Sequence, residues 1–299
     1  MNQHVVNEAR AAFGQLTSAA VSTAWWVPGR IEVLGKHTDY AGGRVLTCAT
    51  NYGLVVVGAA RADAQIRVVS ADSQVVIGEA HSTSAIPLVL ERPPWAVYVD
   101  TVVNRLRANF PGALRGADLA MASDLPPASG MSSSSAPLLG VAAALAAVWK
   151  LDADPRWPRD FPGYAACIGN GNDFGDLRGH TGVGTTGGAM DHTAICGGRA
   201  GHLTCWSLAP TVRESDLALP AGTSLVVAVS GVFAEKAGAA RESYNAVSQR
   251  ARAALALWNR ISGRNDSTLA AAVSAGATAA ASPILIWHFA LSNSSVNQR

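Results

Sequence analysis

The sequence predicts an α+β fold in which helices and strands alternate without a strict βαβ rhythm. Apolar residues make up 49% of the 299 residues and charged residues 15%, a composition typical of chains with sizeable cores. Val- and Ile-rich runs with period-two alternation predict strands, and apolar spacings of three and four predict helices. Both patterns recur along the chain, so we expect a mixed architecture without internal repeats.

The first half of the chain carries the clearest patterns. A run of serines marks the start of its longest helix, because serine is a good N-cap residue. The predicted elements are, in order, a helix within 1–20, several strands within 25–90 (including LVVVG at 54–58 and IRVVS at 66–70), a helix over 95–109, a strand over 118–124, and an Ala-rich helix from Ser132 to Lys150.

The second half is harder to interpret, because proline and glycine interrupt it. Residues 151–163 form a Pro-rich connection, and 164–205 are dense in glycine. The run LVVAVS at 225–230 predicts a strand, followed by a helix through about Arg252. The Ala-rich stretch Leu269 to Leu291 predicts a further buried or amphipathic helix.

Composition also excludes several classes of protein. The net charge is +2 with no basic run, which argues against a nucleic-acid partner. The N-terminus lacks a signal-peptide pattern, and polar residues and Pro283 interrupt the one apolar stretch long enough to span a membrane. The cysteines are far apart and form no CxxC pair, so we expect a reduced cytoplasmic protein without a zinc site or a membrane partner. They are Cys48, Cys167, Cys196 and Cys205.

A loop that suits a phosphate lies at residues 124–140, DLPPASGMSSSSAPLLG. A predicted strand runs into small residues that begin a helix, which directs backbone N–H groups and the helix dipole toward an anion. Serine hydroxyls can add a magnesium ligand. The Walker pattern and the GxSxG elbow are both absent. The structural alternative is a flexible turn before a helix.

A second loop, PGRIEVLGKHTDYAGG at 28–43, suits a polyhydroxyl substrate. Carboxylate and imidazole groups gathered between glycines can bind several hydroxyls at once. The structural alternative is a solvated turn with one ion pair.

Together these segments resemble the GHMP kinase superfamily and, within it, galactokinase. The family patterns GRxNLIGEHTDYxGG, LPxGxGLSSSA and GIMDQ stand here as GRIEVLGKHTDYAGG, LPPASGMSSSSA and GAMDH (188–192). Weaker similarities are WAVYV at 95–99 and ARESYN at 240–245. The resemblance covers most of 25–250 and implies a GHMP kinase fold of two α+β domains. We therefore expect an N-terminal domain over 1–205 and a truncated, partial C-terminal domain over 206–299.

The resemblance also implies a role for each matching residue. Arg30 matches the arginine that stabilises the transferring phosphoryl group, and Asp191 the aspartate that accepts the sugar's proton. The structural alternative for Asp191 is a helix N-cap. The implied substrate-binding residues are Lys36, His37, Thr38, Asp39 and Tyr244. The implied ATP-binding residues are Pro126, Pro127, Ala128, Ser129, Gly130, Met131, Ser132, Ser133, Ser134, Ser135 and Ala136. Mg²⁺ is expected on Ser134 and Asp173.

Three departures from the family pattern bear on function. Lys36 replaces the sugar-binding Glu, so a donor-only cation stands where a carboxylate accepted a hydroxyl, and Glu32, at a position usually Asn, could pair with it. The magnesium-ligating Glu is missing, and Asp173 or Asp176 could take its place, because hard cations need only oxygen ligands. The GxGFGG motif is absent, so we expect an exposed apolar patch at 284–291 (ILIWHFAL) and self-association through it.

The function implied by the resemblance is an ATP-dependent sugar 1-kinase that phosphorylates the anomeric hydroxyl of galactose or a related sugar. Two alternatives stay open. One is a catalytically impaired homologue that only binds sugar or nucleotide, and the other is a GHMP kinase for another sugar.

Overall fold

The computed structural model describes residues 1–72, 76–78, 93–113, 115–127, 129–228 and 240–278. Its frame is one seven-stranded mixed sheet with the order β4-β3-β5-β2-β6-β7, to which β1 adds by pairing with β2. Neighbouring strands are antiparallel except for β3 and β5, which are parallel. The strands are β1 (Thr23–Leu34), β2 (Arg44–Arg61), β3 (Ile66–Ser70), β4 (Val76–Gly78), β5 (Gly116–Ser123), β6 (His202–Ser207) and β7 (Val212–Ala218).

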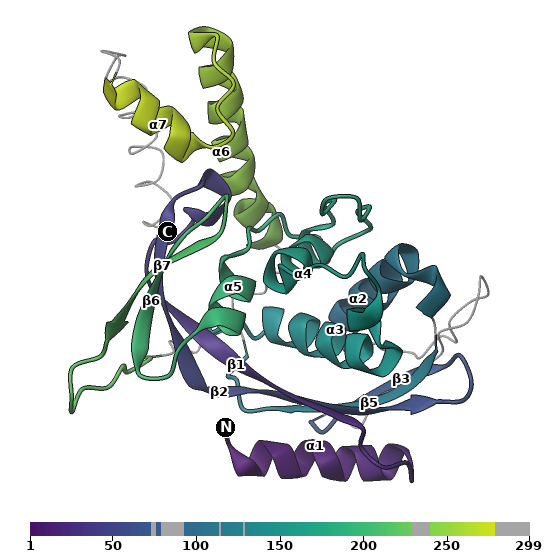
Figure 1. Cartoon of the computed structure of the whole chain (residues 1–299). Coiled ribbons are helices and arrows are strands. Elements are labelled where there is room, and N and C mark those ends of the chain that lie inside the picture. The colour runs from purple at the N-terminus through teal and green to yellow at the C-terminus, as the bar shows by residue number, and fades with distance from the viewer. Residues whose placement is uncertain (73–75, 79–92, 114, 128, 229–239, 279–299) are drawn as a thin grey trace.

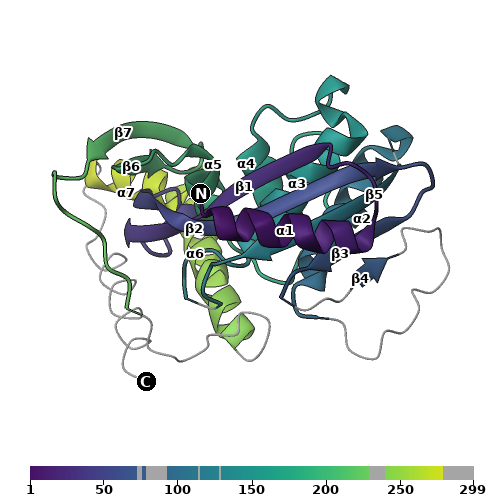
Figure 2. The same cartoon turned by 90° about the horizontal axis from the view of Figure 1, so that it is seen from below.

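Helices cover both faces of the sheet around β2 and β5 (Figures 1 and 2). Among the described residues, α1 covers one face, and α2, α3, α4 and α5 form a layer on the other. Their bounds are α1 (Gln3–Leu16), α2 (Ala96–Asn109), α3 (Ser135–Trp149), α4 (Phe161–Asn170) and α5 (Met190–Gly197), with short 3₁₀ turns η1 (Asp39–Ala41), η2 (Pro111–Ala113) and η3 (Leu151–Ala153).

The apolar run in β2 is explained by burial on both faces. Successive side chains of a strand point to opposite faces, so Val55 and Val57 pack with α1 while Leu54 and Val56 pack with α3. A strand with one solvated face would instead show polar residues at alternate positions.

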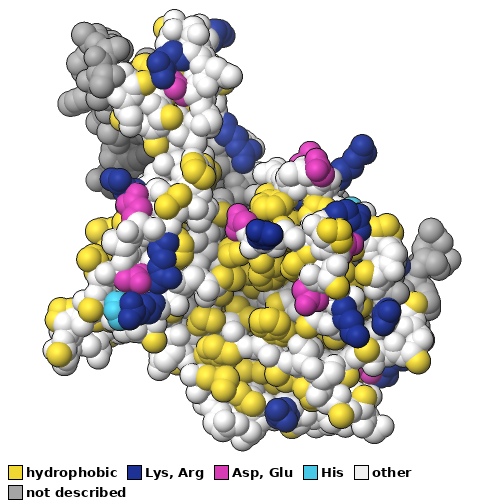
Figure 3. Space-filling model, viewed as in Figure 1, with side chains coloured by type: hydrophobic (Ala, Val, Ile, Leu, Met, Phe, Trp, Pro, Cys, Tyr) yellow, Lys and Arg dark blue, Asp and Glu magenta, His cyan; other side chains and the backbone are white. Residues whose placement is uncertain are grey.

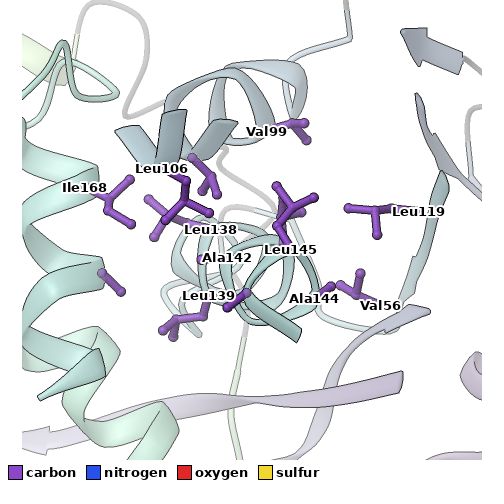
Figure 4. Packing of buried hydrophobic residues seen from close by; sticks show 14 of the residues in the cluster. Val56, Val99, Leu106, Leu119, Leu138, Leu139, Ala142, Ala144, Leu145 and Ile168 are labelled. Carbon is purple, nitrogen blue, oxygen red and sulfur yellow. The ribbon is translucent and has the colours of Figure 1, made fainter. Parts of the chain in front are cut away.

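Helix α3 lies at the centre of the core (Figure 4). Leu138 and Leu145 belong to a buried apolar cluster to which α2, α4, β2 and β5 also contribute side chains, and thirteen of the fifteen residues of α3 are buried. A helix that is apolar all round must be enclosed on every side, which accounts for its Ala-rich composition. In the space-filling view, hydrophobic side chains gather across the middle of the face where this helical layer lies (Figure 3).

The chain continues through β7 into an arm of two helices, α6 (Ala240–Ser262) and α7 (Leu269–Thr278). The arm is sparsely buried, because the buried side chains described in α6 are Ser248 and Ala251, while Ile261 is 67% exposed. Among the described residues, no helix is long and apolar enough to cross a membrane.

Most elements of the first half confirm the sequence predictions: α2, β5 and α3 begin and end within three residues of the expected positions, and α1 lies inside the expected 1–20 but ends four residues before its expected end. Helices α4 and α5 lie in the proline- and glycine-rich part where no element was predicted. The expected strand at 225–230 is wrong over 225–228, where the backbone forms no strand and Val226 is 91% exposed. The predicted domain boundary after residue 205 falls inside β6, which pairs with β2.

Part of the C-terminal prediction lies outside the described residues. The helix expected from Leu269 is present as α7 to Thr278. The apolar segment 284–291, and the self-association proposed through it, lie in the part of the chain that the structure does not describe.

Candidate active site

A cavity of about 530 Å³ lies where β1, the loop before α3, the start of α5 and the arm helix α6 meet. The three motifs that are far apart in the sequence therefore line one space, with Tyr244 of α6 added to them. The predicted residues that line it are Arg30, Lys36, His37, Asp39, Ser129, Gly130, Met131, Ser134, Ser135, Asp191 and Tyr244.

Arg30 and Asp191 form the buried centre of this site. The Arg30 Nε donates to Asp191 Oδ1 at 3.0 Å, and a terminal nitrogen of the guanidinium also pairs with Oδ1. The other terminal nitrogen donates to the carbonyl of Gly130 in the loop before α3 (residues 124–134), the phosphate loop. Arg30 is only 6% exposed, so water and salt screen the attraction between the two charges only weakly. One arginine thus joins the catalytic carboxylate of the prediction to the loop expected to hold phosphate.

Local geometry explains why Arg30 points inward. The register between β1 and β2 shifts between Pro28 and Arg30, an irregularity that re-aims the following side chains. Glu32 is two residues further along the strand, so it faces the same cavity. Burial raises the pKa of Glu32, and the charges of Asp191 and Asp39 act in the same direction, while Arg30 and Lys36 oppose them. The structure records no ion pair between Glu32 and Lys36, both of which it describes.

Asp191 lies in the first turn of α5, where the helix dipole favours a negative charge. The N-cap of α5 is Ala189, with no side-chain cap hydrogen bond, so the N-cap interpretation of Asp191 is not supported. Asp191 Oδ2 accepts a hydrogen bond from the Ser135 hydroxyl at 3.3 Å. Sequence analysis placed Ser135 only in the phosphate loop and missed this contact.

The loop at residues 28–43, the sugar loop, has an unusual backbone conformation. Gly35 has φ of +99°, and His37 has φ of +61°, which non-glycine residues rarely adopt. The Thr38 hydroxyl lies 2.7 Å from the carbonyl oxygen of Gly35 and 3.0 Å from that of Arg44, so Thr38 fastens the loop and is not among the residues that line the cavity.

Two consecutive glycines let the sugar loop and α6 approach the start of α5. A Cβ at Gly188 would lie 2.4 Å from an Asp39 oxygen, and one at Gly187 would lie 3.1 Å from the Tyr244 hydroxyl. Burial raises the pKa of Asp39, while backbone N–H groups including that of Gly188 favour its charged form. Burial also raises the pKa of Tyr244, reinforced by Asp191 and Asp39. The Tyr244 phenol is therefore a hydrogen-bond donor at neutral pH.

The phosphate loop ends at the N-cap Ser134, and α3 starts with Ser135. Ser132 has φ of +63°, is 2% exposed, and its hydroxyl has no partner among the described residues. The Ser129 hydroxyl donates to the carbonyl of Pro126 at 2.7 Å. Pro126, Pro127, Ser132, Ser133 and Ala136 are not among the residues that line the cavity, and Ala128 lies outside the described residues.

His192, which follows Asp191, was missed by sequence analysis. It lines the cavity, is 8% exposed, and neither ring nitrogen has a partner among the described residues. Burial lowers its pKa to about 4, as does Arg30, against the opposing effect of Asp191. The signal available in the sequence was the family's GIMDQ, in which the chain has His in place of Gln.

The residues described here fit Mg²⁺ poorly. Ser134 lines the cavity, but Asp173 is exposed in the loop after α4, where its carboxylate accepts from the Gly179 N–H. No cluster of three or more His, Cys, Asp or Glu side chains that could hold a metal occurs in the described part of the chain. Hard cations prefer carboxylate oxygens. A smaller cavity adjoins Ser134 beside α4, and the described residues that line it include no carboxylate.

Comparisons with known proteins match the two loops to two family models. Residues 10–60 match the galactokinase galactose-binding signature, and residues 97–199 match the GHMP kinases N terminal domain. A galactokinase from Actinobacillus pleuropneumoniae serotype 5b is 40% identical over 111 residues, which cover 37% of this chain and 28% of that protein. One from Actinobacillus succinogenes is 33% identical over 133 residues, covering 44% and 34%. The chain thus spans about a third of these relatives.

The fold comparison extends further along the chain. The structure of Lactococcus lactis galactokinase complexed with galactose covers 88% of this chain, with a TM-score of 0.59 and 21% identity, and the match spans 62% of that structure. This likeness establishes the fold. Both family models match in the order typical of the GHMP kinase superfamily, so the chain is similar to that superfamily over residues 10–60 and 97–199, and the sequence relatives named above are galactokinases.

Proposed function

We propose that the chain transfers a phosphoryl group from ATP to the anomeric hydroxyl of galactose or a closely related sugar. The observation that carries this proposal is the buried Arg30–Asp191 pair, placed between the sugar loop and the phosphate loop in one cavity. Phosphoryl transfer needs two substrates in line, charge stabilisation and at most one proton acceptor, and this arrangement offers each of them.

In this proposal Asp191 takes the proton from the sugar hydroxyl. A guanidinium beside a carboxylate favours its charged form, and the hydrogen bond from Ser135 fixes the orientation of Oδ2. Arg30 uses three of its five N–H donors on Asp191 and Gly130. The two others have no partner among the described residues and are available to oxygens of the transferring group.

The sugar would lie between His37, Asp39 and Tyr244, which together offer an acceptor, a donor and an imidazole. The ring centroids of His37 and Tyr244 are 5.7 Å apart, so both line one side of the sugar position. Lys36 cannot accept a hydrogen bond as a family Glu does, but the cavity also contains the carboxylate of Glu32. We propose that Glu32 takes over hydroxyl recognition, which leaves the choice between galactose and a related sugar to experiment.

ATP would place its phosphates against the loop before α3, with Ser129, Gly130, Ser134 and Ser135 around them. Mg²⁺, when bound, would neutralise phosphate charge, and Ser134 is the described side chain best placed to hold it. Asp173 stays a proposal as its second ligand, although the exposed position of this residue weighs against it.

The test is ADP release by the purified chain over a panel of galactose, other hexoses and pentoses. We expect sugar-dependent ADP release and formation of the sugar 1-phosphate with galactose or a near relative. Asp191→Asn should abolish it, while Asp152→Asn, an exposed acid in η3, should not. Failure of every sugar to stimulate ADP release would contradict the kinase proposal.

A second candidate function is a catalytically impaired homologue that binds sugar or nucleotide without turnover. The observation that favours it is the absence of a carboxylate beside Ser134 among the residues that line the adjoining smaller cavity. Calorimetric titration with sugar and with nucleotide separates the two, because a binder gives saturable heats without ADP release.

A further inference from the structure

A smaller cavity of about 80 Å³ adjoins the proposed active site on the side of α2 and α4. Six residues line both spaces, so the two share a wall. These are Ser134, Ser135, Thr185, Gly187, Gly188 and His192. The smaller cavity therefore lies beside the N-terminus of α3, where the proposed function places phosphate.

The polar side chains of this smaller cavity are all uncharged at neutral pH. Asn170 is already committed, because its Nδ2 donates to the Gly187 carbonyl at 3.1 Å and its Oδ1 accepts from the Asn172 N–H at 3.0 Å. The Ser134 side chain acts on the Tyr98 hydroxyl and opposes the rise that burial causes in the pKa of Tyr98. His192 is thus the buried group that most needs a partner.

The imidazole of His192 is buried beside this cavity, and neither of its nitrogens has a partner among the described residues. The residue is 8% exposed, and its low pKa keeps the ring neutral, with one nitrogen donating and one accepting. A buried polar group without a partner costs free energy, so such groups normally find one in protein, water or ligand. In the part of the chain that the structure describes, no protein group is a hydrogen-bond partner of either ring nitrogen, which points to a ligand in the cavity.

Gly169 explains why no carboxylate reaches this ligand position. Among residues 168–173, where the family pattern supplies an acid, Gly169 and Asn170 line the cavity. A Cβ at Gly169 would lie 3.3 Å from Leu138 Cδ1 and 4.0 Å from His192 Nε2. A longer side chain at this position would therefore enter the same space that the imidazole borders.

We propose that the cavity holds nucleotide phosphate directly through neutral donors, so that nucleotide binding does not require a divalent cation. A carboxylate and a phosphate repel each other and need a cation between them. A helix N-terminus, a serine hydroxyl and an imidazole N–H attract phosphate without one. In this proposal, Gly169 keeps the phosphate position free of a carboxylate, and His192 provides a hydrogen-bond donor to it. The inference rests on the proposed nucleotide site, and it adds that nucleotide binds there without a divalent cation.

The test is calorimetric titration of the full chain with the ATP analogue AMPPNP, once in EDTA and once in excess Mg²⁺. We expect dissociation constants that agree within about threefold. Gly169→Glu should weaken binding in EDTA by about tenfold or more, with recovery in Mg²⁺, because it restores an acid beside phosphate. Gly14→Glu is the matched control, since it adds the same charge on α1, where a Cβ meets nothing within 4 Å.

Variants of His192 test the donor itself. His192→Phe keeps an aromatic ring, although a slightly larger one, without a nitrogen and should weaken binding about tenfold in both buffers, whereas His192→Gln keeps an N–H and should retain most of the affinity. Melting temperatures of all variants establish that they are folded. Wild-type binding in Mg²⁺ but not in EDTA would overturn this inference alone. Binding in neither buffer would overturn the proposed nucleotide site and the inference with it.

Discussion

The α3 layer and the α6–α7 arm both contribute to the candidate active site, but they differ strongly in how deeply their side chains are buried. Helix α3 is enclosed, with thirteen of fifteen residues buried, whereas Leu257 and Ile261 of α6 are 38% and 67% exposed. The Arg30–Asp191 pair rests on the enclosed side, and Tyr244 comes from the arm. The groups proposed for the chemistry thus lie in the enclosed part of the molecule, and a group proposed for sugar recognition lies on the sparsely packed arm.

The comparison predicts unequal costs for the same substitution in the two regions. Leu145→Ala in α3, at a side chain that is 0% exposed, should lower the free energy of unfolding by about 2–5 kcal/mol. Leu257→Ala in α6 should cost less than about 1 kcal/mol, because this leucine loses little burial. Urea denaturation followed by tryptophan fluorescence measures both. Equal costs would mean that the arm is part of the core.

Removing the proposed proton acceptor should leave the chain folded but stop the reaction. Asp191→Asn should lower turnover by about 100-fold or more, the usual scale for loss of a general base. Sugar binding should stay detectable by calorimetry, because His37, Asp39 and Tyr244 remain. Near-normal turnover would exclude this role for Asp191.

The success of the sequence predictions follows the same division. In the enclosed region, the apolar periodicity agrees with the observed burial, so α1, α2, β5 and α3 were found from pattern alone. In LVVAVS, the apolar run that predicts a strand remains exposed over 225–228, since composition does not specify which neighbour a strand pairs with. Helix α5 begins shortly after Gly187 and Gly188, and no helix was predicted there because glycine disfavours helices.

The pH dependence of stability should report on the enclosed side. Burial lowers the pKa of His192 from 6.5 to about 4, so between these values the unfolded chain binds more protons and stability falls as pH falls. This histidine should cost about 2 kcal/mol between pH 7 and pH 5. Urea unfolding at both pH values, in wild type and His192→Gln, measures the difference. An equal acid loss in the variant would assign the effect to other groups.

The smallest effect is expected from the arm's contribution to the site. Tyr244→Phe removes one hydroxyl and should raise the KM for sugar by about three- to tenfold, the scale of one neutral hydrogen bond, with kcat nearly unchanged. Tyr52→Phe is a matched control, because Tyr52 is 46% exposed on β2. A large fall in kcat instead would move Tyr244 from recognition to the chemical step.

The site was predictable in its membership and less so in its contacts. Motif resemblance supplied Arg30, His37, Asp39, Asp191 and Tyr244, all of which line one cavity. It could not supply the Ser135–Asp191 hydrogen bond, because any of four adjacent serines could have faced the carboxylate. The unpaired state of His192 likewise depends on which side chains pack around it, and a single sequence does not contain that information.

The pairing of β2 with β6 has a consequence for how the chain is made. Val45 pairs with Trp206, so the first part of β2 gains this neighbour only after about 160 further residues have been synthesised. At ribosomal speeds of 5–20 residues per second this takes roughly 8–30 s. During that interval one edge of β2 offers unpaired N–H and C=O groups to any other nascent chain. Slower translation of the segment between them would lengthen the exposure, and a chaperone that shields strand edges should raise the yield of folded protein.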